Sequence, residues 1–289
     1  MWSRSQRYFS GHISTSLLII VLFCLALRLI FFAGMGTSDP LWYSKAAANI
    51  GQGIDQDNIA TLSTRIGLTY PVGFIYKILG VNDFSSALFN LITSIGSIIL
   101  MFYFGKLFFN EKVGLLSAFL FAIFPLEIVY ATKLTSDFPA AFFMGLGLYF
   151  FLYQEIKAEK KQWPYYFLSG IMIGVGYLIR ESMLVIALFF IAYMIYKRKI
   201  AKEYFLVPIG VLLILVLEMA FFFSLTGDPL YRTHASQEIL KESMEQHDYY
   251  GRLDFPQGLF HYPWLFLTDH TLTFFYMFVL LSIAYCLWK

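Results

Sequence analysis

Two aspartates lie one or two residues before a proline at the edges of apolar segments. Asp39 is found in Ser-Asp-Pro and Asp137 in Ser-Asp-Phe-Pro. A carboxylate in such a position can take a proton from a hydroxyl, so each is a candidate general base. Two carboxylates at one face could also bind a divalent cation. The same pattern fits an ordinary helix start with an aspartate cap, and the residues leave both alternatives open.

Further charged residues lie within or between apolar segments. Arg28, Glu127 and Glu218 lie inside them, where a central charge costs about 2.5–3.5 kcal/mol on insertion scales. Arg28 is either a functional cation or a side chain that extends to the membrane interface, and Glu218 is either functional or paired with a buried cation. The dipeptide Arg180-Glu181 lies at a turn between two apolar segments. It is either an exposed ion pair of little energetic value or a clamp for an anion such as phosphate.

The composition indicates what kind of chain must position these residues. Of its 289 residues, 58% are hydrophobic, 20% are aromatic and only 14% are charged. A typical soluble domain has about 45–50% apolar and about 25% charged residues, so the composition excludes both a disordered chain and a soluble domain. The net charge of +2 gives no electrostatic case for binding nucleic acid. Cys24 and Cys286 both lie in apolar runs, which indicates buried thiols rather than a disulfide framework.

The apolar runs predict the fold class. A bilayer-spanning helix needs about 20 mostly apolar residues, and continuous rather than alternating runs indicate helices instead of barrel strands. We predict an all-α polytopic transmembrane helical bundle of about eight spans. A shorter run at 71–80 fits an interfacial or re-entrant helix. The predicted spans are 14–34, 86–105, 113–131, 138–154, 164–180, 183–197, 204–224 and 267–288.

The loop charges predict the orientation. Lys and Arg concentrate in the short loops that are cytoplasmic when the N-terminus is cytoplasmic. The long segments 35–85 and 225–266, which we expect to carry short interfacial helices, then lie outside, as do Asp39, Asp137 and Arg180. We therefore predict one membrane-embedded domain over residues 1–289 without a soluble domain. Its expected location is the plasma (inner) membrane, with multiple passes and the active face outward.

Six segments, in order along the chain, resemble those of a known family. These segments are 26–29, 39–51, 69–80, 124–137, 170–181 and 225–231. They look like the bacterial branch of the GT-C glycosyltransferases, the dolichyl-phosphate-mannose–protein mannosyltransferase-like family 39. The resemblance extends from about residue 20 to 232, and its specificity lies in the order and spacing of the segments.

The resemblance implies an enzyme. It implies transfer of a sugar from a polyprenyl-phosphate-linked donor to an acceptor hydroxyl of a protein, lipid or glycan at the outer membrane face. By this carry-over Asp39 is the base on the acceptor, and Asp39 and Asp137 are the candidate ligands of a divalent cation. A fixed cation would stabilise the phosphate as it leaves. The implied residues for binding the substrate or the lipid phosphate are Arg28, Tyr43, Asp137, Arg180 and Glu127.

Two departures from the family pattern keep other functions open. Many relatives carry an acidic pair in the first outer loop, whereas Pro40 follows Asp39 here. Relatives also usually have further helices, so we expect a short relative, a C-terminally truncated fragment or an inactive member. One alternative is a prenyl-lipid or polymer transporter or flippase, which needs the phosphate-binding arginines but no base. Another is an assembly subunit without chemistry. The expected partners are the lipid bilayer, the lipid-linked sugar and an unassigned acceptor, with no nucleic acid and no certain cofactor.

Overall fold

The computed structural model describes residues 4–52, 64–198 and 201–246, and the regular secondary structure in these ranges is helical throughout. The prediction of an all-α fold is therefore confirmed. The chain divides into two compact units, Met1–Ala235 and Ser236–Lys289, and the arrangement below is that of the first unit. The helices are α1 (Arg4–Ile30), α2 (Asp39–Gln52), α3 (Ile66–Leu79), α4 (Asp83–Phe108), α5 (Glu111–Ala122), α6 (Pro125–Tyr130), α7 (Asp137–Ile156), α8 (Trp163–Ile179), η2 (Glu181–Val185), α9 (Ile186–Lys197), η3 (Lys202–Phe205), α10 (Leu206–Thr226) and α11 (Tyr231–Gln246).

Within the described residues, two helical stretches are long and apolar enough to cross a membrane, Asp83–Phe108 and Lys202–Thr226. Shorter apolar helices cover Thr15–Ile30, Ile66–Leu79 and Trp163–Ile179. The run at 71–80, predicted as an interfacial or re-entrant helix, forms the second part of α3, which begins at Ile66 and ends at Leu79. The crossing of the bilayer by all eight predicted segments stays a prediction, and the last of these segments, 267–288, lies outside the described residues.

The predicted span 113–131 is wrong as one continuous helix. The chain instead forms α5 and the short α6, with Phe124 extended between them at φ −66° and ψ 119°. Pro125 is the cause, because a proline disfavours helical conformation in the residue before it and is itself well placed in the first turn of a helix. The break turns Glu127 into a first-turn residue of α6.

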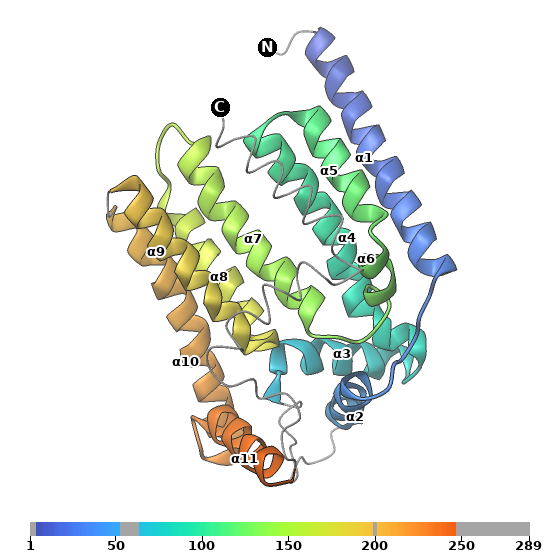
Figure 1. The fold of residues 1–289 in the computed structure, drawn as a ribbon, viewed down its shortest axis with the longest axis vertical. Coiled ribbons are helices and arrows are strands. Elements are labelled where there is room, and N and C mark those ends of the chain that lie inside the picture. The colour runs from blue at the N-terminus through green and yellow to red at the C-terminus, as the bar shows by residue number, and fades with distance from the viewer. Residues whose placement is uncertain (1–3, 53–63, 199–200, 247–289) are drawn as a thin grey trace, which may run out of the picture. The chain divides into compact units, whose positions relative to one another are not determined.

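The long helices pack side by side, while α2 and α3 lie across one end of them (Figure 1). Helix α8 packs against α7 and α10, and α4 packs against α5 and α7. At the end where α2 and α3 lie, α4 and α7 begin and α8 ends (Figure 1). Functional side chains from several helices can therefore meet there.

Small residues set how closely the helices approach. A Cβ atom on Gly170 of α8 would lie 2.0 Å from the Val207 carbonyl oxygen, and one on Gly210 of α10 would lie 2.5 Å from the Phe167 carbonyl oxygen. The α2–α3 pair has the same property, since a Cβ on Gly73 would lie 2.8 Å from the Ala47 carbonyl oxygen. Such close backbone contact is typical of helix pairs in membranes.

Candidate active site

A buried apolar cluster supports the end of the bundle where α2 and α3 lie. Its members come from α2, α3, α7, the loop before α7 and the end of α8. This cluster fixes the positions of the polar side chains above it, because packed side chains leave little freedom to the backbone that carries them. Its buried residues are Tyr43, Ala47, Leu68, Val72, Tyr76, Leu134, Ala140 and Ile179.

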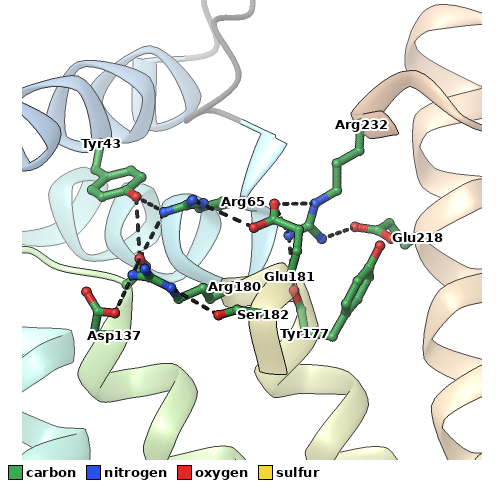
Figure 2. A network of polar contacts seen from close by, with 10 residues as sticks. Tyr43, Arg65, Asp137, Tyr177, Arg180, Glu181, Ser182, Glu218 and Arg232 are labelled. Carbon is green, nitrogen blue, oxygen red and sulfur yellow. Dashed lines mark hydrogen bonds and ion pairs between the residues drawn. The ribbon is translucent and has the colours of Figure 1, made fainter. Parts of the chain in front are cut away.

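Arg65, directly before α3, connects three elements. Its Nη1 contacts the hydroxyl of Tyr43 on α2 and donates to the Oγ of Ser136, which precedes α7, at 2.9 Å. Tyr43 also donates to Ser136 Oγ at 3.4 Å, and its ring lies under the Arg65 guanidinium. Figure 2 shows Arg65 between Tyr43 on one side and Glu181 on the other. The serine hydroxyl therefore marks the place where α2, α3 and α7 meet.

Arg180, which follows α8, reaches the same serine. Its Nη1 lies 3.5 Å from Ser136 Oγ and forms an ion pair with Asp137, while its Nε donates to Ser182 at 3.2 Å. The N-cap of α7 is Ser136, so the capping alternative for Asp137 is wrong and its carboxylate pairs with an arginine instead. Arg180 and Glu181 do not form the local ion pair considered from the sequence, because each pairs with residues of other elements.

Glu181 begins a second, more buried half of the same network. Its Oε1 accepts from Arg232 Nη2 at 2.6 Å and Nε at 2.9 Å, and its Oε2 lies 3.7 Å from Arg65 Nη2. Arg232 also donates to Glu218 at 2.5 Å and to the Tyr177 carbonyl at 3.0 Å. Figure 2 shows the resulting chain of contacts from Tyr43 to Glu218. Arg232 is the buried cation that the sequence allowed as a partner for Glu218.

The surroundings shift the pKa values of Tyr43 and Glu181. Burial raises the pKa of the Tyr43 phenol and outweighs the opposite effects of the hydrogen bond with Ser136 and of the Arg65 charge. The phenol is therefore protonated at neutral pH and can donate a hydrogen bond. Burial opposes ionisation of Glu181, but Arg232 and Arg65 outweigh it and hold the pKa of this carboxyl below its usual range. Glu181 is thus a fixed anion between two guanidinium groups.

Asp39 is exposed at the start of α2, one turn before Tyr43. The helix begins at Asp39, and Ser38 before it has a positive φ of 66°, a conformation that is uncommon for a residue other than glycine. Asp39 is therefore the first residue of the helix, whereas the capping alternative placed it one position before the helix, at the N-cap. Its role as a base stays a prediction, which its exposure and its proximity to Tyr43 permit.

Arg28 and Glu127 form a separate, fully buried cluster. Arg28 Nη2 lies 3.7 Å from Glu127 Oε1, Arg28 Nε donates to Ser94 at 2.8 Å, and Ser94 donates to Glu127 at 2.7 Å. Arg28 Nη1 also reaches the carbonyl of Ala122 at 3.2 Å. Among the described residues, no hydrogen bond or ion pair joins this cluster to Arg180. Substrate binding by Arg28 or Glu127 stays a prediction, and the contacts observed are internal.

One polar face of α4 connects the two clusters. Ser86, Asn90 and Ser94 are spaced four residues apart and so lie on one side of the helix. Ser86 bonds the Tyr76 hydroxyl at 2.6 Å, Asn90 donates to the Thr135 carbonyl at 2.9 Å, and Ser94 contacts the buried pair. The hydrogen bond from Asn90 fixes the loop that carries Ser136 and Asp137.

The sequence did not single out three residues of this site. Arg65, Ser136 and Arg232 carry most of its hydrogen bonds. For Arg232 a signal existed, because an acidic residue inside an apolar segment requires a partner. No signal in the sequence pairs Arg65 with Ser136, which lie 71 positions apart. Within the described residues, no group of three or more His, Cys, Asp or Glu side chains could hold a metal ion, and the cation predicted at Asp39 and Asp137 stays a prediction.

Comparison with known proteins identifies the family. The family model described as dolichyl-phosphate-mannose-protein mannosyltransferase matches residues 66–222, which is more than half of the chain. No curated protein and no solved structure matches. The matched segment contains Glu127, Asp137, Arg180 and Glu181, whereas Asp39, Tyr43 and Arg65 precede it. The chain belongs to the dolichyl-phosphate-mannose-protein mannosyltransferase family and thus to the membrane glycosyltransferases.

Proposed function

We propose that this protein transfers a sugar from a polyprenyl-phosphate-linked donor to an acceptor hydroxyl at the outer face of the plasma membrane. The observation that carries the proposal is the convergence of Arg65 and Arg180 on the single hydroxyl of Ser136. Two guanidinium groups brought together from different elements, beside exposed carboxylates, form a site that an anionic ligand can complete. Family membership supplies the reaction class.

The arginines account for the phosphate of the donor. Arg65 and Arg180 come from the start of α3 and the end of α8, and Tyr43 adds a hydroxyl donor beside them. Guanidinium groups bind phosphate oxygens with two parallel hydrogen bonds. As the bond between the sugar and the phosphate oxygen breaks, charge develops on the phosphate, and cations already in place stabilise that transition state.

Asp39 accounts for the acceptor. The acceptor hydroxyl must lose its proton as it attacks the sugar carbon, on the face opposite the phosphate. Asp39 is exposed one helical turn from Tyr43, whose hydroxyl contacts Arg65, while Arg180 pairs with Asp137. We assign Asp39 the role of general base. Asp137, which pairs with Arg180, borders the phosphate site, and a divalent cation there is permitted but not required.

An apolar groove accounts for the lipid chain of the donor. A cavity of about 410 Å³ lies between α8, α9 and α10 and is lined almost entirely by apolar side chains. It includes Leu184, three residues after Glu181, and continues to Tyr204 in η3, directly before α10. A prenyl chain in this groove would have its phosphate near Arg180. We propose a multi-pass arrangement of about eight spans, with the site at the outer face.

The test is consumption of a polyprenyl-phosphate-sugar donor in membranes that carry the chain at matched expression. Asp39→Asn should lose at least about a hundredfold, because a general base contributes about 10²–10⁴. Glu111→Gln, which changes a partly exposed acid of the first turn of α5 that pairs with Lys106, is the control and should retain activity. Loss of donor binding in Arg180→Gln without any donor consumption by the wild type would instead indicate a lipid transporter. Wild type that neither binds nor consumes any donor would contradict the proposal.

A further inference from the structure

The three arginines of the site differ in how many contacts their guanidinium groups make within the protein. Arg232 is almost fully buried and donates to Glu181, Glu218 and a backbone carbonyl. Arg180 is 35% exposed, and its ion pair joins one nitrogen to one oxygen of Asp137, whose side chain is 58% exposed. Solvent-exposed ion pairs contribute little to stability. The pair of Arg180 and Asp137 is therefore the contact in this network that a ligand can displace most easily.

The charges of the network already balance. Arg65, Arg180 and Arg232 are matched by Asp137, Glu181 and Glu218. An anion that binds Arg180 must consequently compete with Asp137, and it then lies beside a carboxylate that no longer has its partner. The repulsion grows with the charge of the ligand. A phosphodiester carries one negative charge, whereas a phosphate monoester carries about two near neutral pH.

We propose that Asp137 forms its ion pair with Arg180 at the place where the ligand phosphate binds, and that it thereby determines specificity. It favours a singly charged phosphodiester over a doubly charged phosphate monoester. The inference rests on the function proposed above. There, the lipid-linked sugar is the diester, and the lipid phosphate left after transfer is the monoester. Asp137 thus weakens the binding of the product more than that of the donor, and this promotes product release.

The experiment measures binding of two probes to the purified full chain in phosphatidylcholine nanodiscs. The probes are a short-chain prenyl phosphate and the methyl diester of the same phosphate, which differ by one charge and require no knowledge of the sugar. Asp137→Asn should tighten binding of the diester about fivefold and binding of the monoester by about the square of that factor. The reason is that the substitution removes the repulsion between the Asp137 carboxylate and each negative charge of the ligand, at the high dielectric of an exposed site. The ratio of the two affinities should therefore shift about fivefold toward the monoester.

Asp83→Asn is the matched control. It removes the same charge from the same end of the bundle, but Asp83 is an exposed residue in the first turn of α4, whereas the ion pair of Arg180 is made with Asp137. It should change the ratio less than about twofold, because water and salt screen charges that are not in contact. A second variant, Asp137→Ser, should reproduce the shift, and thermal unfolding of each variant checks that the fold is retained.

The outcomes separate this proposal from the one on which it rests. If the wild type binds both probes, and Arg180→Gln abolishes that binding while Asp137→Asn leaves the ratio unchanged, the phosphate site stands and the selectivity role is refuted. Weaker binding in Asp137→Asn would also refute it, because Asp137 would then help to hold the ligand. If the wild type binds neither probe, or Arg180→Gln has no effect, the phosphate site itself fails.

Discussion

Arg232 provides the sharpest test of how the site is held together. Its guanidinium donates to Glu218 and Glu181 at 2.5–2.9 Å, and the side chains of Arg232 and Glu218 are only 5% and 7% exposed. Substitution by glutamine leaves Glu218 as a buried charge without a counterion. Breaking a buried pair in this way costs about 3–5 kcal/mol, because the remaining charge keeps its desolvation penalty.

The loss of stability in Arg232→Gln can be measured as a fall in the thermal unfolding temperature in detergent. For a chain of this size, about 3–5 kcal/mol corresponds to a fall in Tm of about 6–15 °C. Arg232→Gln combined with Glu218→Gln should recover much of the loss, since the double variant has no unpaired buried charge at this position. The difference between the double variant and the sum of the single ones should be about 1–3 kcal/mol. A single-variant cost below about 1 kcal/mol, or no recovery in the double variant, would refute the reasoning.

Three further predictions concern other parts of the same end of the bundle. Glu127→Gln leaves the fully buried Arg28 without its counterion and should cost about 3–5 kcal/mol in the free energy of unfolding, measured by denaturant titration; no loss would contradict the pairing. The depressed pKa of Glu181 stabilises the fold above pH 4.5, the ordinary pKa of the group, and this contribution is lost as the pH falls through the depressed pKa. Glu181→Gln should therefore lose less stability below about pH 4.5 than the wild type does. An acid-unfolding profile identical to that of the wild type would refute this prediction. Gly73→Ala places a methyl group 2.8 Å from a carbonyl oxygen of α2 and should cost about 1–3 kcal/mol, whereas Gly145→Ala meets only the flexible end of a leucine side chain and should cost less; equal effects would contradict the α2–α3 contact.

The helices could be predicted because each apolar run is long and continuous. Helices occupy every predicted span within the described residues. The main exception is the break at Phe124. Hydrophobicity is continuous across Pro125 and so predicted one helix, although the residue before a proline is biased away from helical conformation. Local chemistry would have located this boundary, whereas hydropathy alone could not.

The site was predicted only in part, for a reason that concerns distance along the chain. Asp137 and Arg180 were found because each stands out locally, at a proline and at a turn between apolar segments. Their contact joins the start of α7 to the residue after α8, and the packing of these two helices creates it. Arg65 and Ser136 have no such local signature, and their meeting depends on how α2, α3 and α7 pack together.

The exposure of the three arginines argues for a division between holding the fold and binding the ligand. Arg232, 5% exposed and fully occupied, cannot accept a ligand without losing contacts that the fold requires. Arg65, 19% exposed, keeps one weak ion pair at 3.7 Å, and Arg180, 35% exposed, keeps one that water can reach. Substitutions should therefore reduce stability most at Arg232 and ligand binding most at Arg180. Such an order follows from burial alone, because a buried charge is expensive to leave unpaired and an exposed one is free to exchange its partner.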